Sequence, residues 1–253
     1  MAKQAKTRDT SLFLPTTAAE LSARGIEQLD FVYIIGDAYV DHPSFGPAII
    51  SRVLESHGYT VGILSQPDWH SAEAFRRLGR PRLAFLISAG NIDSMVNHYT
   101  SAKKRRSSDA YTPGGEAGKR PDRATIVYAN RAREAYRGVP VIIGGIEASL
   151  RRFAHYDYWD DKVRRSILSD SGADLLIYGM GERQIVEIAD ALAGGLPAEQ
   201  ITYVNGTCYM THSLERVYEY ETIESYEAVA RDKKAYAAAF MVQYREQDAI
   251  RGK

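Results

Sequence analysis

The chain has 253 residues, of which 45% are hydrophobic and 25% are charged, and its 32 Lys and Arg residues balance 32 Asp and Glu residues. This composition is typical of a folded globular protein, and it lacks the basic excess of proteins that bind nucleic acid or anionic membranes. The single cysteine, Cys208, excludes an internal disulfide and a cysteine-ligated metal cluster. Because no apolar run resembles a signal peptide or is long enough to span a bilayer, the sequence predicts a cytoplasmic protein.

Residues 1–30 are predicted to form an N-terminal extension with one short helix. Thr17 and Glu20 have the spacing of a capping box, in which each side chain accepts a hydrogen bond from a backbone amide of the first turn. The apolar run Phe31–Gly36 comes next. Such a run is typical of a buried strand that helices cover on both faces.

Strands and helices then alternate from residue 31 to about residue 206. Pro47 suits the first turn of a helix and Gly58 suits the position after its last turn, so a helix is expected between them. This alternation is typical of βαβ units, which build a parallel sheet. The sequence therefore predicts a doubly wound α/β domain of the flavodoxin-like type, with a mainly parallel sheet. Further strands are predicted over residues 59–65, 82–88, 139–145, 173–179 and 201–210, and further helices over residues 71–79, 122–138 and 181–195.

An insertion of about residues 89–121 interrupts this alternation and contains a glycine-rich stretch. A phosphate-binding loop needs GxxxxGK followed by Ser or Thr after a strand. Here the spacing from Gly114 to Gly118 is one residue short, and Arg120 stands where the hydroxyl would be required. The stretch is therefore not a P-loop. The basic run Lys103–Arg106 is interpreted as a solvated loop face, with a phosphate or nucleic-acid contact as the alternative.

The loops that follow the predicted strands form the candidate binding site. In an open parallel sheet, ligands bind beyond the carboxyl ends of the strands. Each of these loops places glycine where the backbone turns sharply, although ordinary turn chemistry explains any one of them alone. No metal ligands and no catalytic residues are assigned. The residues expected to line the site and bind a cofactor are Asp37, His42, Gly90, Asn91, Gly144, Gly145, Glu147, Gly181 and Glu182.

Several long motifs resemble the N-terminal region of one family. The segments are GDAYVDHPSFG, SAGNIDSMVNHYT, DAYTPGGEAGKRPDRA, GGIEASLRRFAHYDYWDDKVRRSIL and LLIYGMGER. Together they are similar to YgiQ-type (UPF0313) radical SAM proteins, and the resemblance runs from about Phe13 to the end of the chain.

The resemblance implies a catalytic part that this chain does not contain. Radical SAM enzymes of this kind hold a [4Fe–4S] cluster on a CxxxCxxC motif in a partial TIM-type barrel, where the cluster binds and cleaves S-adenosylmethionine. This chain has no such motif. The cluster and S-adenosylmethionine are therefore expected on a downstream barrel of the same full-length protein, and the chain alone is expected to be inactive.

The resemblance also implies a likeness to cobalamin-binding domains. In well-known modules of that kind, a DxHxxG loop supplies the histidine that ligates cobalt. Here His42 directly follows Asp41 and Gly46 lies four residues further on, so the spacing departs from that motif. Cobalamin held without a histidine ligand stays an alternative.

Residues 207–253 are predicted to form a connector and one long helix that begins at about Glu224. Its apolar stripe is expected to contact the downstream barrel, with the sheet domain or a second copy of the chain as alternatives. The leading hypothesis is an accessory α/β domain that helps to form a substrate or cofactor chamber. The alternatives are a stand-alone binding module for cobalamin or a nucleotide, and a dimerisation domain. The predicted stripe consists of Tyr226, Val229, Ala230, Ala237, Phe240, Met241 and Tyr244.

Overall fold

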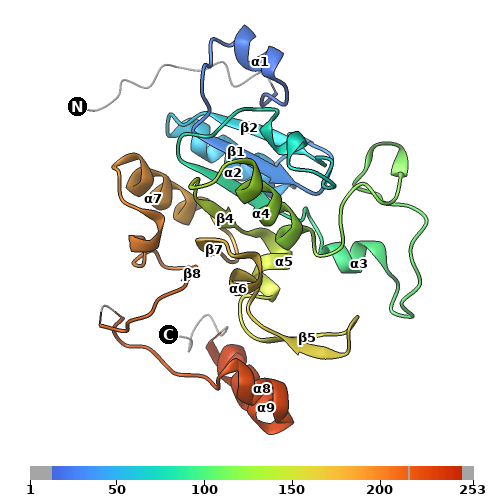
Figure 1. Ribbon diagram of the computed structural model, residues 1–253, viewed down its shortest axis with the longest axis vertical. Helices are drawn as coiled ribbons and strands as arrows, with labels where there is room; N and C mark the ends of the chain where they lie inside the picture. The colour runs from blue at the N-terminus through green and yellow to red at the C-terminus, as the bar shows by residue number, and fades with distance from the viewer. Residues whose placement is uncertain (1–12, 216, 247–253) are drawn as a thin grey trace. The chain divides into compact units, whose positions relative to one another are not determined.

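The computed structural model describes residues 13–215 and 217–246 (Figure 1). The described chain separates into two compact units. The larger contains residues 13–152 and 168–210, and the smaller contains residues 153–167, 211–215 and 217–246.

A six-stranded sheet in the order β2-β1-β3-β4-β7-β8 forms the centre of the larger unit. The first five strands are parallel, and β8 pairs with β7 in the antiparallel direction. The order of the parallel strands, 2-1-3-4-5 when they are counted alone, is that of flavodoxin-like domains. The predicted doubly wound, mainly parallel α/β fold is confirmed. The strands are β1 Phe31–Ile35, β2 Val61–Ser65, β3 Ala84–Ser88, β4 Val141–Ile143, β7 Leu175–Ile177 and β8 Thr207–Tyr209.

Helices cover both faces of the sheet, which is why its central strands read as continuous apolar runs. Phe31, Tyr33 and Ile35 share one core cluster with side chains of α2 and α7. Val32 and Ile34 point to the opposite face and are also fully buried. In Figure 1, α4 lies in front of the sheet and α2 behind it. The helices of the larger unit are α1 Ala18–Ala23, α2 Gly46–Ser56, α3 Ser94–His98, α4 Ala124–Ala135, α5 Gly145–Leu150 and α7 Glu182–Ala193, with 3-10 turns η1 Glu73–Arg76, η2 Pro113–Gly115 and η3 Ala198–Gln200; α6 Ile167–Ser171 begins at its boundary.

The helix starts follow local capping chemistry. The capping box of Thr17 and Glu20 is present at the start of α1, as predicted. The helix expected to begin at Asp122 begins instead at Ala124. Arg123 has a left-handed backbone with φ of 51°, and Asp122 is held away from the helix because its carboxylate accepts hydrogen bonds from His98 and Tyr99.

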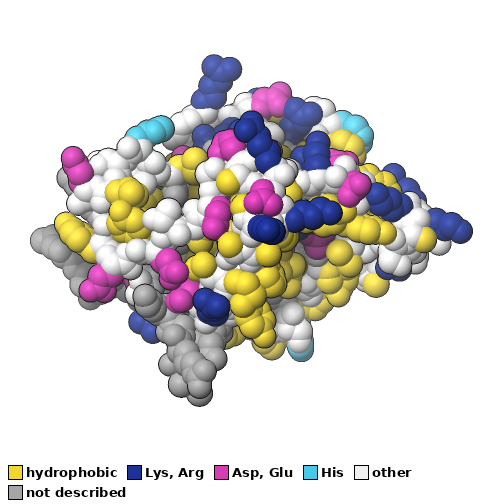
Figure 2. Space-filling view, turned by 90° about the horizontal axis from the view of Figure 1, so that it is seen from below, with side chains coloured by type: hydrophobic (Ala, Val, Ile, Leu, Met, Phe, Trp, Pro, Cys, Tyr) yellow, Lys and Arg dark blue, Asp and Glu magenta, His cyan; other side chains and the backbone are white. Residues whose placement is uncertain are grey.

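The insertion is compact but carries little regular structure. Isolated bridges pair Tyr99 with Arg105 and Ser108 with Glu116. All four side chains of the Lys103–Arg106 run are exposed, as expected of a solvated loop face. Lys and Arg side chains gather on the right of the view in Figure 2, the side on which Figure 1 shows the insertion.

The smaller unit contains an antiparallel hairpin and two helices. The hairpin pairs β5 His155–Asp157 with β6 Lys162–Arg164, and α8 Tyr226–Arg231 packs on β6. The single long helix expected from Glu224 is divided in two, because Asp232 adopts an extended backbone between α8 and α9 Lys233–Glu246. The Asp232 carboxylate accepts a hydrogen bond from Lys234 N at 2.9 Å, as an N-terminal cap does.

The apolar stripe of the predicted tail helix is only partly covered. Val229 is buried, whereas Phe240, Met241 and Tyr244 are exposed. Phe240 and Tyr244 stack on each other with their ring centroids 6.2 Å apart. The partner of this surface, whether a barrel, the sheet domain or a second copy, stays a prediction. Within the described residues, no helix is both long enough and apolar enough to cross a lipid bilayer.

The carboxyl ends of β1 and β3 approach each other too closely for a side chain. A Cβ on Gly36 would lie 2.1 Å from the carbonyl oxygen of Ala89, while Gly36 N donates a hydrogen bond to Ser88 O at 3.2 Å. The glycine therefore sets the separation of the two strand ends, and through them the position of the loop that begins at Gly90.

We predict that Gly36→Ala lowers the free energy of unfolding by about 1–3 kcal/mol, because the strand ends must separate to admit a methyl group. Gly46→Ala is the matched control, since a Cβ on Gly46 meets nothing within 4 Å and alanine favours a helix. Urea denaturation of both variants measures the difference. Equal stability of the two variants would show that the strand ends are not in close contact.

Candidate functional site

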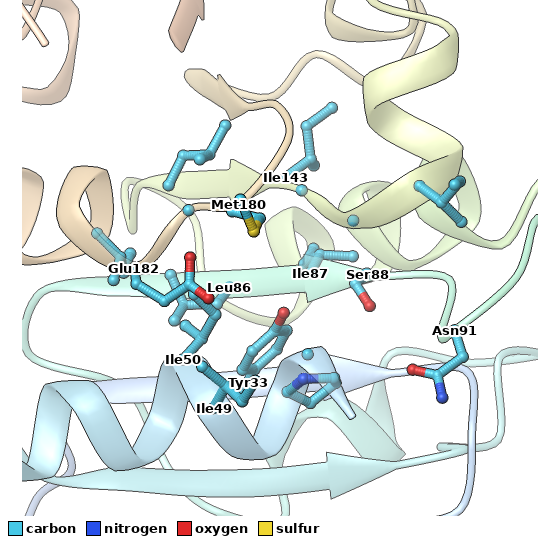
Figure 3. A pocket seen from close by; sticks show the side chains of 18 of the residues that line it. Tyr33, Ile49, Ile50, Leu86, Ile87, Ser88, Asn91, Ile143, Met180 and Glu182 are labelled. Atoms are coloured by element: carbon cyan, nitrogen blue, oxygen red, sulfur yellow. The ribbon is translucent and has the colours of Figure 1, made fainter. Parts of the chain in front are cut away.

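A cavity of about 330 Å³ lies where β1, β3, β4 and β7 end, in the larger unit (Figure 3). Its volume is at the lower end of the range of small-molecule sites. Apolar side chains from the strands, from α2, α5 and α7 and from the loop after β7 form most of its wall. They include Ile49, Ile50, Leu86, Ile87, Ile142, Ile143, Ile177, Met180 and Ile185.

The polar side chains of the described lining are Tyr33, Ser44, Ser88, Asn91 and Glu182. Figure 3 shows four of them in the order Glu182, Tyr33, Ser88 and Asn91, with the Glu182 carboxylate and the Tyr33 hydroxyl turned toward the middle of the cavity. Burial raises the pKa of Tyr33 to about 12, against a smaller lowering by the hydrogen bond with Ser88. The phenol is therefore neutral at physiological pH and can both donate and accept a hydrogen bond.

The described lining of the cavity carries one negative charge. Among the described residues that line it, Glu182 is the only charged side chain, and there is no Lys, Arg or His. Glu182 is half-buried in the first turn of α7, where the helix dipole favours a carboxylate. The site is thus an apolar slot with neutral hydroxyl and amide groups and a carboxylate at one end.

Six of the nine predicted site residues line this cavity and three do not. Asp37, His42 and Glu147 lie outside the lining. The six in the lining belong to the loops after β3, β4 and β7. They are Gly90, Asn91, Gly144, Gly145, Gly181 and Glu182.

Asp37 belongs to a buried ion-pair network beneath the loop after β3. The Arg120 guanidinium, 1% exposed, lies 2.7 Å from Asp37 Oδ1 and 2.9 Å from Asp109 Oδ2. Arg120 also donates a hydrogen bond to the carbonyl of Ala89 at 2.9 Å. The glycine-rich stretch therefore places the Arg120 guanidinium at the end of the sheet, and it does not have the form of a phosphate-binding loop.

Asp37 also fixes the loop that lines the cavity. Its carboxylate accepts a hydrogen bond from Asn91 N at 2.6 Å. A Cβ on Gly90 would lie 2.0 Å from Asp37 Oδ1, and Gly90 has a φ of +115°, so glycine is required there on both counts. Asp37 thus positions two lining residues without touching the cavity itself.

The two carboxylates of this network differ in their affinity for a proton. Burial raises the pKa of Asp37 by more than the attraction of Arg120 lowers it. Burial also acts to raise the pKa of Asp109, but the hydrogen bond from Tyr111 N and the attraction of Arg120 leave it lowered. One guanidinium faces two carboxylates, so Asp37 is the one that accepts a proton first.

Glu147 and His42 have local partners of their own. The Glu147 carboxylate is 1% exposed and accepts hydrogen bonds from Ser94 N at 2.8 Å and Thr125 N at 2.9 Å. It therefore satisfies backbone amides in the first turns of α3 and α4. His42 accepts a hydrogen bond from Ser44 N at 3.1 Å and lies in a neighbouring hollow against α2.

Neither an iron–sulfur cluster nor another metal centre finds ligands in the described residues. No group of three or more His, Cys, Asp or Glu side chains is placed to hold a metal ion. Burial raises the pKa of the Cys208 thiol to about 11, so the thiolate that iron requires is disfavoured.

The larger unit is a doubly wound α/β domain with a cavity at the carboxyl edge of its sheet. A family model described as Radical SAM N-terminal matches residues 13–253. A UPF0313 protein of Clostridium perfringens (strain ATCC 13124) is 60% identical over 242 residues, which cover 95% of this chain and 37% of that protein. A UPF0313 protein of Clostridium botulinum (strain 657) is 58% identical over 241 residues, or 95% of this chain and 38% of that protein.

The chain therefore belongs to the radical SAM N-terminal family, and its relatives are UPF0313 proteins. It spans a little over a third of the length of the curated relatives it matches. Among solved structures it is similar to the radical S-adenosylmethionine methyltransferase TsrM from Kitasatospora setae. With tryptophan and a SAM analogue bound, that structure gives a TM-score of 0.48 and 17% identity over 72% of this chain and 29% of that one. The structure of the same protein with cobalamin and a [4Fe-4S] cluster bound gives a TM-score of 0.47 and 18% identity. That comparison covers 73% of this chain and 28% of that one.

We predict that Asp109→Asn lowers the free energy of unfolding by about 3 kcal/mol at about pH 7, because it removes a partner of a buried cation. Asp37→Asn costs less, about 1–2 kcal/mol, since burial opposes the charge of Asp37 more strongly and asparagine still accepts from Asn91 N. Urea denaturation measures both values. A cost for Asp37→Asn equal to that for Asp109→Asn would contradict the assignment.

The pH dependence of the same pair is a separate check. The folded-state pKa of Asp109 is lowered, so its stabilisation is present above its unfolded pKa and is lost as the pH falls toward the folded value. The folded-state pKa of Asp37 is raised, so its ionised form opposes folding above the unfolded pKa. The difference in the free energy of unfolding between wild type and Asp109→Asn should therefore persist from about pH 7 down to about pH 4 and shrink only below about pH 4.

Proposed function

We propose that this chain is an accessory ligand-binding domain of a radical SAM enzyme. It holds part of an organic substrate or cofactor in the cavity at the carboxyl edge of the sheet, and it helps to form the chamber in which the rest of the protein acts. The observation that carries the proposal is the cavity itself, which lies where ligands of doubly wound sheets bind and is lined from four strands and three helices.

The catalytic cluster is assigned to the remainder of the full-length protein. Family membership implies a [4Fe–4S] cluster and S-adenosylmethionine, whereas this chain offers one thiol with a raised pKa. The curated relatives contain nearly two thirds of their length beyond the matched region. The proposed partner of this domain is therefore that further part of the same polypeptide.

Cobalamin is the second candidate ligand. The described lining contains no imidazole or thiol that could ligate cobalt, and His42 lies in the neighbouring hollow. A cobalamin at this edge would be held through contacts with its organic groups.

The cavity can be tested by filling it. We predict that Ile50→Trp, on the α2 wall, weakens binding of the fluorescent probe 1-aminoanthracene about tenfold or more, because the indole occupies the space for the ligand. Val53→Trp is the matched control: Val53 is half-buried on the same helix and lies outside this cavity. Fluorescence titration gives both dissociation constants, and urea denaturation verifies that both variants are folded. Equal binding by the two variants, or no saturable binding by the wild type, would overturn the proposal.

Anaerobic reconstitution provides a separate test of where the cluster belongs. Treatment of this chain with iron and sulfide should yield no stable four-iron cluster, since one cysteine cannot supply the ligands. Iron analysis and visible absorption measure the outcome, with a full-length UPF0313 protein as the control. A stable cluster on this chain would contradict the proposed division.

A further inference from the structure

We infer that the cavity selects a neutral or cationic planar ligand that carries an N–H donor, and that it rejects anions. This inference rests on the proposed function, because it assigns the ligand chemistry of the same cavity. It follows from three features of the site: the charge that the lining carries, the pairing of the nearby cations, and the shape of the wall.

The first feature is the Glu182 carboxylate. Figure 3 shows it turned into the cavity on the side of Tyr33. Within the described residues, Glu182 has neither a side-chain hydrogen bond nor an ion pair, although it is half-buried. A half-buried carboxylate that has lost part of its water gains from a donor, and a charge-assisted N–H to carboxylate hydrogen bond is about twice as strong as a neutral one. A ligand bound in the cavity would supply the N–H donor to the Glu182 carboxylate.

The second feature is that three arginines of the surrounding elements are paired with carboxylates, while Arg183 of α7 is exposed and lies outside the cavity lining. Arg52 of α2 pairs with Asp41 and with Glu55. Arg151 pairs with Asp93, and Arg120 is buried in the network below the loop after β3.

An anionic group in the cavity would therefore be desolvated next to Glu182. No positive side chain of the described lining would compensate it. Phosphate-bearing nucleotides are disfavoured in this slot for the same reason.

The third feature is the shape and polarity of the wall. Isoleucines of α2 face the ends of β3, β4 and β7 across the cavity, which suits a flat aromatic body. Met180 lies 85% exposed in the lining, and its flexible thioether can pack against a ring. The hydroxyls of Tyr33 and Ser88 and the amide of Asn91 can pair with ring heteroatoms. The ligand class is thus a nitrogen heteroaromatic or aromatic amine without an anionic substituent.

Two probes with the same three-ring body test this selectivity. 1-Aminoanthracene is neutral and carries an N–H donor, whereas anthracene-1-carboxylate is an anion of nearly the same shape. The wild-type chain should bind the amine at least about tenfold more tightly than the carboxylate, which corresponds to one charge-assisted hydrogen bond. Equal affinity for the two probes would overturn the inference.

The variant Glu182→Gln assigns the selectivity to one side chain. It should weaken binding of the amine and strengthen binding of the carboxylate, so that the ratio of the two dissociation constants falls about tenfold. Glu187→Gln is the control, because Glu187 is an exposed acid of the same helix that lies outside the lining, and it should leave the ratio unchanged. An unchanged ratio in Glu182→Gln would exclude the assigned role.

The two proposals fail in different ways in these titrations. If Ile50→Trp does not weaken binding of either probe, the cavity is not the binding site and the proposed function fails. If Ile50→Trp abolishes binding but Glu182→Gln leaves the ratio unchanged, the cavity binds ligands and only the selectivity inference fails.

Discussion

The buried Arg120 guanidinium connects three parts of the larger unit that are far apart in the sequence. It pairs with Asp37 after β1 and with Asp109 in the insertion, and it donates to the carbonyl of Ala89 after β3. A buried cation is tolerated only when such partners surround it. The geometry of the loop after β3 therefore depends on the insertion being folded, and that loop contributes Gly90 and Asn91 to the cavity wall. Residues 109–120 of the insertion thus contribute to the site without lining it.

The sequence was sufficient to predict the sheet, because each central strand is a continuous apolar run bounded by glycine or polar residues. It was less reliable where single polar side chains decide a boundary. Asp122 is of a residue type that commonly caps helices. Its carboxylate instead accepts hydrogen bonds from His98 and Tyr99. Asp232 falls inside a helical period, yet it interrupts the helix because its carboxylate accepts from Lys234 N. Such outcomes depend on competing partners, and residue spacing alone does not reveal them.

The candidate site was predictable in part for a related reason. Glycines after parallel strands mark the carboxyl edge, and most of the predicted residues there do line the cavity. The apolar wall was missed because Ile50 and Leu86 have the same sequence pattern as core residues. Tyr33 and Ser88 carried a weak signal, since each places a hydroxyl within an apolar strand run. Arg120 carried none, because a buried arginine and a solvated one are alike in a basic loop until both carboxylates are located.

The electrostatics of the site follow from this arrangement of cations. Arg120 lies at the end of the sheet, near the region where an anionic ligand of a doubly wound domain would bind, but its charge is matched by Asp37 and Asp109. The cavity above it keeps the carboxylate of Glu182 and gains no compensating cation from the described lining. The network of Asp37, Arg120 and Asp109 therefore shapes the cavity wall, and it also keeps the Arg120 guanidinium paired with carboxylates of the chain instead of with a ligand. For that reason the proposed ligand is recognised by burial of its apolar body and by hydrogen bonds from its N–H donors to oxygen atoms of the site. A phosphate would have to be bound by a part of the full-length protein outside this cavity.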